Sequence, residues 1–381
     1  MNRAFSTYLD ALRFLAALTV VLSHWAYERF TGGAFVGIRD YNLGSDAVVV
    51  FFVLSGLVIA YTAETKDRTL GAFGFCRATR LLSVALPALA LTFVLDRLGA
   101  HLDPPAYEGW WYVPRSLPEM LWNGLTFSSE WHMPGVRLGT NGPYWSLSYE
   151  VAYYLLFAAA FFLAGPLRIL TLAVLALLIG VKVLLLLPVW LTGVSIWLRM
   201  RSAASAKEPR RLLWAMAVLP ILVYLACLAA GVPGLLWRAT VSAAGMEPDI
   251  LRAVLGFSDE FLWNLLIGAL VSIHLRAMWR LSRTWPATEQ SWPANAIRWL
   301  AGASFSIYLV HYPVMQFADA VLPDTVPLRP WLLLGATLGA CFFFAEAFER
   351  SLPELRSSLT RWGPPLASLA TILRPADRPL D

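Results

Sequence analysis

Apolar residues run through the chain in ten stretches, most of them long enough to cross a hydrocarbon core of about 30 Å as a helix. Short connections that carry Gly, Pro and charged residues separate the stretches. The stretches cover approximately residues 8–27, 44–63, 79–98, 146–164, 168–181, 184–198, 211–230, 257–274, 298–317 and 330–348. The pattern predicts an all-α integral membrane protein with about ten transmembrane helices.

The run from residue 168 to residue 198 fits either one tilted span or two short helices hinged around Lys182–Pro188. Charge favours two helices, because the split brings the basic connections to one side of the membrane. These connections carry Arg3, Lys66, Arg68, Arg77, Arg80, Arg199, Arg201, Lys207, Arg210, Arg211, Arg276, Arg280, Arg283 and Arg298. The positive-inside rule makes that side cytoplasmic and places both termini inside.

The composition excludes an ordinary soluble protein, since 58% of the residues are hydrophobic and 14% are charged. The net charge of +5 follows from the topology, so we expect no nucleic-acid partner. The three cysteines are scattered, with no ligand spacing to the five histidines, and predict neither a disulfide framework nor a metal site. Asp10 and Arg13 interrupt any signal-peptide pattern, so we expect the first helix to be retained. We expect a transmembrane domain over residues 1–352 and a partly disordered cytoplasmic tail over 353–381.

Arg13 and His24 lie eleven residues apart within the first apolar stretch. Eleven helical steps of about 100° leave about 20°, so both side chains point from one helix face, about 16 Å apart along the axis. Ionisable side chains within a span indicate a functional site by default. The alternative is a snorkelling arginine and an interfacial histidine.

The predicted topology sorts the ionisable groups by depth. Toward the outer side lie His24, Asp46 near the start of the second helix, Glu150 in the first turn of the fourth and His311 near the end of the ninth, and toward the inner side lie Arg13, Arg77 and Arg80. A histidine beside carboxylates suits general-base activation of a hydroxyl, and neighbouring guanidinium groups suit a phosphate. Each group also has a structural explanation: a helix cap, a dipole contact or a solvated loop charge for the carboxylates, packing ahead of a break at Pro313 for His311, and anchoring for the arginines.

The longest connection, residues 99–144, falls on the external face and is rich in aromatic residues. This region contains Trp110, Trp111, Tyr112, Trp122, Trp131, Tyr144 and the adjoining Trp145. These side chains form either a membrane aromatic belt, the interpretation that we favour, or a surface that stacks on sugar rings.

Five short motifs, in order along nearly the whole chain, resemble those of the membrane-bound acyltransferase-3 family. They are the Arg-x10-His pair Arg13 and His24, the Phe-Phe-x-Leu-Ser-Gly motif in Val50–Gly56, the Arg-x-x-Arg element in Arg77–Leu82, the Trp-Ser-Leu-x-x-Glu motif Trp145–Glu150 and the Tyr-Leu-x-His-x-Pro motif Tyr308–Pro313. The family's Glu-Arg-Pro element is incomplete, because Glu349 and Arg350 are followed by Ser351. We therefore expect Glu349 to be a structural cytoplasmic group.

The resemblance implies an O-acyltransferase of a bacterial inner membrane that moves an acyl group, most commonly acetyl from acetyl-coenzyme A. The acceptor would be a hydroxyl of a surface or exported polysaccharide, a glycolipid, or a secreted lipid or antibiotic. The implied donor site is formed by Arg77, Arg80 and Arg13, with His24 as general base and Glu150 orienting its imidazole. A covalent acyl-histidine intermediate is a variant of this scheme. The acceptor side is assigned to Asp46, Trp145, Tyr308 and His311.

Two further functions belong to other classes of protein. A glycan or lipid transporter would use Arg13 and His24 as a proton-coupled or substrate site. No internal repeat of helical hairpins is obvious, which disfavours this alternative. A structural membrane subunit of a polysaccharide assembly complex is the other alternative.

Overall fold

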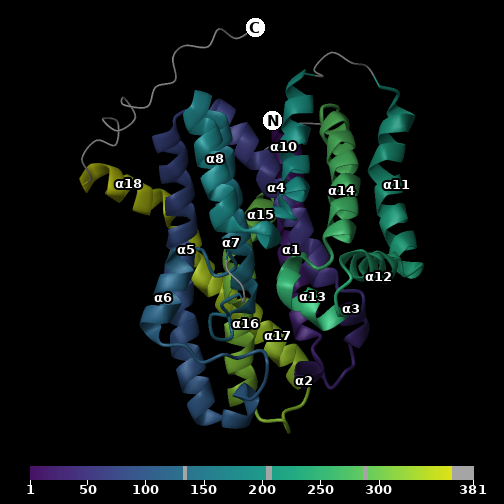
Figure 1. Cartoon of the computed structure of the whole chain (residues 1–381). Coiled ribbons are helices and arrows are strands. Elements are labelled where there is room, and N and C mark those ends of the chain that lie inside the picture. The colour runs from purple at the N-terminus through teal and green to yellow at the C-terminus, as the bar shows by residue number, and fades with distance from the viewer. Residues whose placement is uncertain (132–134, 203–207, 286–290, 363–381) are drawn as a thin grey trace. The chain divides into compact units, whose positions relative to one another are not determined.

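The computed structural model describes residues 1–131, 135–202, 208–285 and 291–362, and every regular element in this part of the chain is a helix (Figure 1). The chain divides into two compact units, each formed by two separate stretches. Unit 1 comprises Met1–Ala60 and Val181–Ser304, and unit 2 comprises Tyr61–Gly180 and Phe305–Asp381. The predicted tail begins with the helix Leu352–Trp362, and its remainder from residue 363 lies outside the described residues.

Unit 1 is organised around one long helix, α14, which packs against α1, α10, α11 and α12, while α1 also packs against α3 and α15. Its elements are α1 (Arg3–Trp25), α2 (Glu28–Thr31), α3 (Val36–Asp40), α4 (Leu43–Thr65, up to Ala60), α9 (Val181–Leu184), α10 (Leu187–Ser202), α11 (Arg210–Ala229), α12 (Val232–Ala244), α13 (Pro248–Leu255), η3 (Gly256–Ser258), α14 (Phe261–Ser282) and α15 (Trp292–Ala301).

Unit 2 is organised around α5, which packs against α6, α7, α18 and the short elements η1 and η4. Its elements are α5 (Leu70–Leu102), η1 (Pro104–Tyr107), α6 (Leu117–Leu125), η2 (Gly142–Tyr144), α7 (Trp145–Phe162), α8 (Gly165–Ile179), α16 (Ser304–Val321, from Phe305), α17 (Arg329–Phe344), the π-helix η4 (Ala345–Glu349) and α18 (Leu352–Trp362).

Seven helical stretches of the described chain are long and apolar enough to cross a membrane. They are Arg3–Trp25, Leu43–Thr65, Leu70–Leu102, Val181–Ser202, Arg210–Ala229, Pro248–Ser282 and Arg329–Thr360. The three other predicted spans overlap α7, α8 and α16, which are helical. The count of ten and the cytoplasmic placement of the termini stay predictions.

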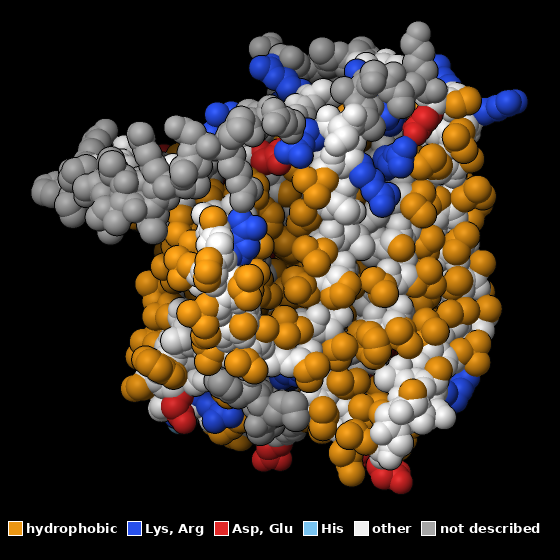
Figure 2. All heavy atoms as spheres, turned by 45° about the horizontal axis from the view of Figure 1, so that its top comes forward, with side chains coloured by type: hydrophobic (Ala, Val, Ile, Leu, Met, Phe, Trp, Pro, Cys, Tyr) orange, Lys and Arg blue, Asp and Glu red, His pale blue; other side chains and the backbone are white. Residues whose placement is uncertain are grey.

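Large apolar side chains remain exposed on the flanks of these helices. On α8, Ile169, Leu170 and Leu177 are 71%, 62% and 84% exposed. Figure 2 shows hydrophobic side chains over much of the visible face. An apolar surface of this kind is the one that lipid covers in a membrane.

The structure confirms the division of the run 168–198. Gly180, with φ of +81°, ends α8, and a second break follows between α9 and α10. The predicted span 298–317 is wrong at its start, because the turn between α15 and α16 falls inside it. Helix α16 then continues through Pro313 to Val321, so the expected break at Pro313 is also wrong. Membrane helices tolerate proline where neighbouring groups satisfy the freed carbonyl.

The predicted external loop over 99–144 is largely structured, since it contains the end of α5, η1, α6 and η2. Helix α6 begins with a capping box in which Ser116 and Glu119 bind each other's backbone amides. The hydrogen bonds from Ser116 lower the pKa of the Glu119 carboxyl.

Candidate functional site

Helix α1 carries Arg13 and His24 on one continuous helix from Arg3 to Trp25, so the predicted spacing along one face applies. The Asn2 side chain caps the helix by accepting a hydrogen bond from the Phe5 amide at 2.8 Å. Arg13 Nη1 lies 3.6 Å from Asp10 Oδ1, and both side chains are about a quarter exposed (23% and 25%). The arginine charge is therefore partly balanced within its own helix.

His24 lies against an aromatic and cationic group formed by the segment that follows α1. Its ring stacks on Tyr27 with centroids 6.0 Å apart. The Arg39 guanidinium lies 4.2 Å from the Tyr27 ring centroid, and Arg39 Nη1 donates to Ser23 Oγ at 3.1 Å. Arg29 approaches the same ring at 5.4 Å. Two arginines that sequence reasoning missed thus lie near His24; their only signal was positive charge in an otherwise ordinary connection.

The start of α4 packs closely on α1 beside His24. A Cβ atom at Gly44 would lie 2.7 Å from Ser23 Oγ, so only glycine permits this approach. Asp46 is in the first turn of α4 and is 5% exposed. Its carboxylate accepts hydrogen bonds from Tyr224 Oη at 2.7 Å and Trp263 Nε1 at 3.0 Å. The alternative that Asp46 is a solvated loop charge is therefore wrong.

In unit 2, two of the sequence motifs meet at Tyr308. The Tyr308 hydroxyl contacts Ser146 Oγ at 2.8 Å and the Pro143 carbonyl at 3.1 Å. Trp145, next to Ser146, packs edge-to-face on Tyr149 with centroids 5.1 Å apart. The motif of α16 thus fixes the start of α7.

His311 is fully buried in α16, and its Nδ1 lies 2.9 Å from the Ile307 carbonyl oxygen. Because a carbonyl only accepts, Nδ1 carries the proton and donates it. This contact within one helix turn agrees with the packing role considered for His311.

Glu150 lies in the second turn of α7, so its predicted place in the first turn is wrong. The helix begins at Trp145, after the separate turn η2. Glu150 accepts a hydrogen bond from the Tyr154 hydroxyl. Arg77 and Arg80 also act electrostatically on that hydroxyl, so both share a neighbourhood with Glu150. This differs from the prediction, which placed Glu150 toward the outer side of the membrane and Arg77 and Arg80 toward the inner side. The predicted helix began near these arginines, whereas α5 begins at Leu70, so both lie beyond its first turn.

Both arginines of α5 already have acidic neighbours. Arg77 Nη2 pairs with Asp67 Oδ2 at 2.7 Å, and each side chain is 12% exposed. Arg80 acts electrostatically on Glu349, which accepts from the backbone amides of Ser306 at 2.8 Å and Phe305 at 3.3 Å. Glu349 therefore caps the N-terminus of α16, as expected of a structural group.

The segment before α7 is held to α5 by a second polar group that the sequence did not reveal. Asp96, 3% exposed, accepts from Thr140 N at 2.9 Å and Thr140 Oγ1 at 2.5 Å. Asn141 Nδ2 donates to Thr92 Oγ1 at 3.1 Å. Burial, with a smaller contribution from the Asp96 charge, raises the pKa of the nearby Tyr112 hydroxyl. Trp110 and Trp122 remain 63% and 72% exposed, so they are the aromatic side chains of this segment most available to lipid or sugar.

Within the described ranges, no group of three or more His, Cys, Asp or Glu side chains is placed to hold a metal ion. The three cysteines are unpaired thiols, and only Cys341 is buried.

The family described as "Acyltransferase domain" (Acyl_transf_3) matches residues 6–346, which include most of both helical units and all five motifs. The chain belongs to the acyltransferase-3 family. "Acyltransferase MdmB" of Streptomyces mycarofaciens is 34% identical over 152 residues, which are 39% of this chain and 37% of that protein. The chain thus aligns with little more than a third of the length of this curated relative. No solved structure matches the chain.

In this chain, the Phe-Phe-x-Leu-Ser-Gly motif of α4 serves helix packing. Trp190 Nε1 of α10 donates to Ser55 Oγ at 3.2 Å. A Cβ atom at Gly56 would collide with the Trp190 carbonyl, and one at Gly193 would collide with the Val53 carbonyl. Two glycines thus let α4 and α10 approach closely, as small residues do in membrane helix pairs.

Proposed function

We propose that this acyltransferase is an integral-membrane O-acyltransferase that transfers acetyl from acetyl-coenzyme A to a hydroxyl of a surface or exported polysaccharide or glycolipid, in a bacterial inner membrane. The observation that carries the proposal is the family match over residues 6–346. The seven candidate membrane helices of the described chain are consistent with a multi-pass enzyme. The continuous helix that holds Arg13 and His24 on one face supplies the chemical groups.

In the proposed reaction, His24 accepts the proton of the acceptor hydroxyl while the hydroxyl oxygen attacks the acyl carbon. The new carbon–oxygen bond forms as the carbon–sulfur bond of the thioester breaks. The coenzyme A thiolate leaves and takes the proton from the imidazolium. Arg13 is assigned to the donor and Glu150 to the catalytic groups, and these two roles rest on the motifs alone.

The donor phosphates require guanidinium groups that are still able to bind an anion. Arg77 is engaged by Asp67, although its buried Nε has no hydrogen-bond partner among the described residues. Arg80 lies in the same stretch of α5. Guanidinium forks suit phosphate, so both residues fit an anionic donor, with Arg77 also serving a structural ion pair.

Replacing Arg80 with glutamine is expected to raise the KM for acetyl-coenzyme A several-fold and to weaken the dependence of KM on salt, with kcat at saturation little changed. Steady-state thiol release at several ionic strengths measures this. Arg68→Gln is the matched control, because Arg68 is an exposed residue of the α4–α5 turn. An unchanged KM in Arg80→Gln would leave Arg80 as a membrane anchor.

The function itself is tested by free thiol released from acetyl-coenzyme A by the purified chain in lipid nanodiscs. We expect release to rise when an extract of the host's surface glycans is added. Binding of glycan without thiol release, also with succinyl and longer acyl donors and with folded protein, would instead favour a transporter or a structural subunit.

A further inference from the structure

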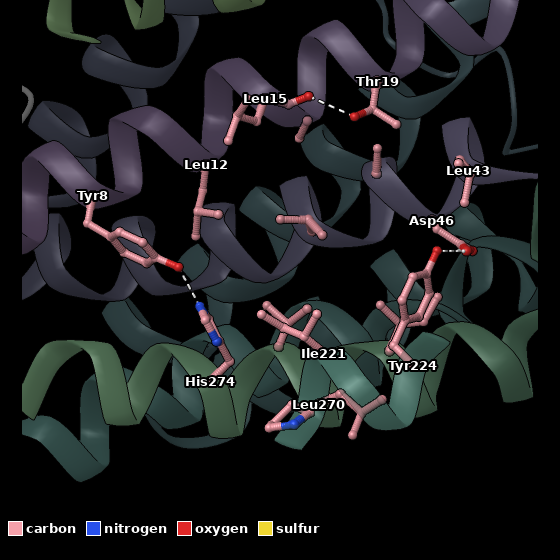
Figure 3. Close-up of a pocket in the computed structure, with 16 residues that line it drawn as sticks. Tyr8, Leu12, Leu15, Thr19, Leu43, Asp46, Ile221, Tyr224, Leu270 and His274 are labelled. Carbon is pink, nitrogen blue, oxygen red and sulfur yellow. Dashed lines mark hydrogen bonds between the residues drawn. The ribbon is translucent and has the colours of Figure 1, made fainter. Parts of the chain in front are cut away.

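Unit 1 contains an elongated cavity of about 420 Å³ between α1, α4, α11 and α14 (Figure 3). Most of its lining is apolar, from residues such as Leu12, Val50 and Leu270. Leu15 and Ile221, which also line it, are 54% and 49% exposed, so the cavity reaches the surface between α1 and α11. All four helices belong to candidate membrane spans, so this opening faces hydrocarbon.

Polar groups occur at the two ends of this groove and not along its middle, as Figure 3 shows. At one end, the Tyr8 hydroxyl pairs with His274 Nε2, while His274 Nδ1 donates to the Ala217 carbonyl at 2.7 Å. At the other end, Tyr224 donates to Asp46. On α1 the groove extends from Tyr8 to Thr19, which is about 16 Å of helix.

The lining discriminates between the two substrates of the proposed reaction. None of its sixteen residues is Lys or Arg, so it offers nothing to the phosphates of coenzyme A. An apolar channel that opens toward lipid suits a hydrocarbon chain. The Asp46 carboxylate has about four lone-pair positions and uses two on Tyr224 and Trp263, which leaves capacity for hydroxyl donors.

The Asp46 end of the groove lies at the same end of α1 as His24. Gly44, two residues before Asp46, packs against Ser23, which precedes His24. On a helical wheel, the mean direction of the α1 positions that line the groove is roughly 120° away from the face of Arg13 and His24. A molecule in the groove would therefore occupy a different face of α1 from the proposed base, with its head toward the same end of the helix.

We propose that this groove holds the hydrocarbon chain of a lipid-carried acceptor, with the polyol headgroup at Asp46. The proposal rests on the proposed function and names the acceptor class as an amphiphile with one long chain and a hydroxyl-rich head. The chain supplies a second binding element that concentrates the head near His24.

The direct test is labelling with a dodecyl glucoside that carries a diazirine in its chain, added to the protein in nanodiscs and mapped by mass spectrometry. We expect label on groove residues such as Leu12 and Leu270. The label should be lost in Ala16→Trp, which fills the groove from a site that is 6% exposed. Ala269→Trp is the matched control, because Ala269 is an exposed residue of α14 next to Leu270 and should leave labelling and turnover unchanged. Ala47→Phe provides a second, smaller obstruction from α4.

Kinetics separate this proposal from the function on which it rests. We compare free glucose and dodecyl glucoside as acceptors. When both are acetylated, kcat/KM for dodecyl glucoside should fall about tenfold or more in Ala16→Trp, toward the value for glucose. The KM for acetyl-coenzyme A should stay constant. Equal kcat/KM values for glucose and dodecyl glucoside would overturn the groove assignment. Labelling of the groove by a diazirine phosphatidylcholine would also overturn it, if dodecyl glucoside does not compete with that lipid. Absence of thiol release with every acceptor, with glucoside labelling intact, would instead overturn the acyltransferase function.

Discussion

Replacing His24 with alanine is expected to lower acyl transfer on the order of 10²- to 10⁴-fold, the usual contribution of a general base. An alkoxide is too unstable to form without a proton acceptor, and no other imidazole shares the α1 face with Arg13. Donor binding should persist, because the proposed phosphate contacts come from arginines. Thiol release at saturating acetyl-coenzyme A and calorimetric binding of coenzyme A measure the two quantities separately.

His101→Ala is the matched control, since His101 is an exposed residue in the last turn of α5. Its activity should equal that of the wild type. Loss of both coenzyme A binding and thermal stability in His24→Ala would show a structural role for the imidazole and its stack on Tyr27. Undiminished transfer in His24→Ala would exclude the proposed mechanism.

The relation between Arg13 and His24 could be predicted because both lie on one helix, where residue spacing alone determines direction. The helices themselves could also be predicted, because their long apolar runs dominate the sequence. The division of the run 168–198 could also be predicted, because charge on its flanks is a local signal that agrees with the break at Gly180.

Relations between distant segments could not be predicted in this way. The bond between Tyr308 and Ser146 joins two motifs that the sequence shows only as separate runs. The pairing of Arg77 with Asp67 depends on how the α4–α5 turn folds back. Asp46 is buried because Tyr224 and Trp263 approach it from two other helices. The last two contacts decide whether a charged residue is available to a substrate.

The region 99–144 shows a different limit of prediction from sequence. Its aromatic and turn-forming residues give no periodic signal, so sequence reasoning treats it as a loop. The fold nevertheless buries Asp96 against Thr140 and orders much of the segment on α5. Trp110 and Trp122 are exposed while Trp111 and Trp131 are half-buried, a difference that composition alone does not reveal.

Replacing Gly56 with alanine is expected to destabilise unit 1 by about 1–3 kcal/mol, the usual cost of overpacking. The added methyl group would collide with the Trp190 carbonyl and lie 3.2 Å from the Val194 amide nitrogen. These are backbone atoms within a helix, so α4 and α10 must separate to make room. The hydrogen bond from Trp190 to Ser55 would lengthen with them. The unfolding temperature should fall, and the emission wavelength of the tryptophan fluorescence should shift.

Gly335→Ala is the matched control, because it also places a methyl group in the interior of a membrane helix, α17, but nothing lies within 4 Å of the new atom. Its unfolding temperature should be unchanged or slightly higher, since alanine favours the helix. Gly193→Ala tests the same contact from α10, where the added atom would meet the Val53 carbonyl. Because both substitutions force the same two helices apart, their combination should cost less than the sum of the single effects. Full stability of Gly56→Ala would mean that α4 and α10 do not pack at this distance, and the packing role assigned to the motif would then be wrong.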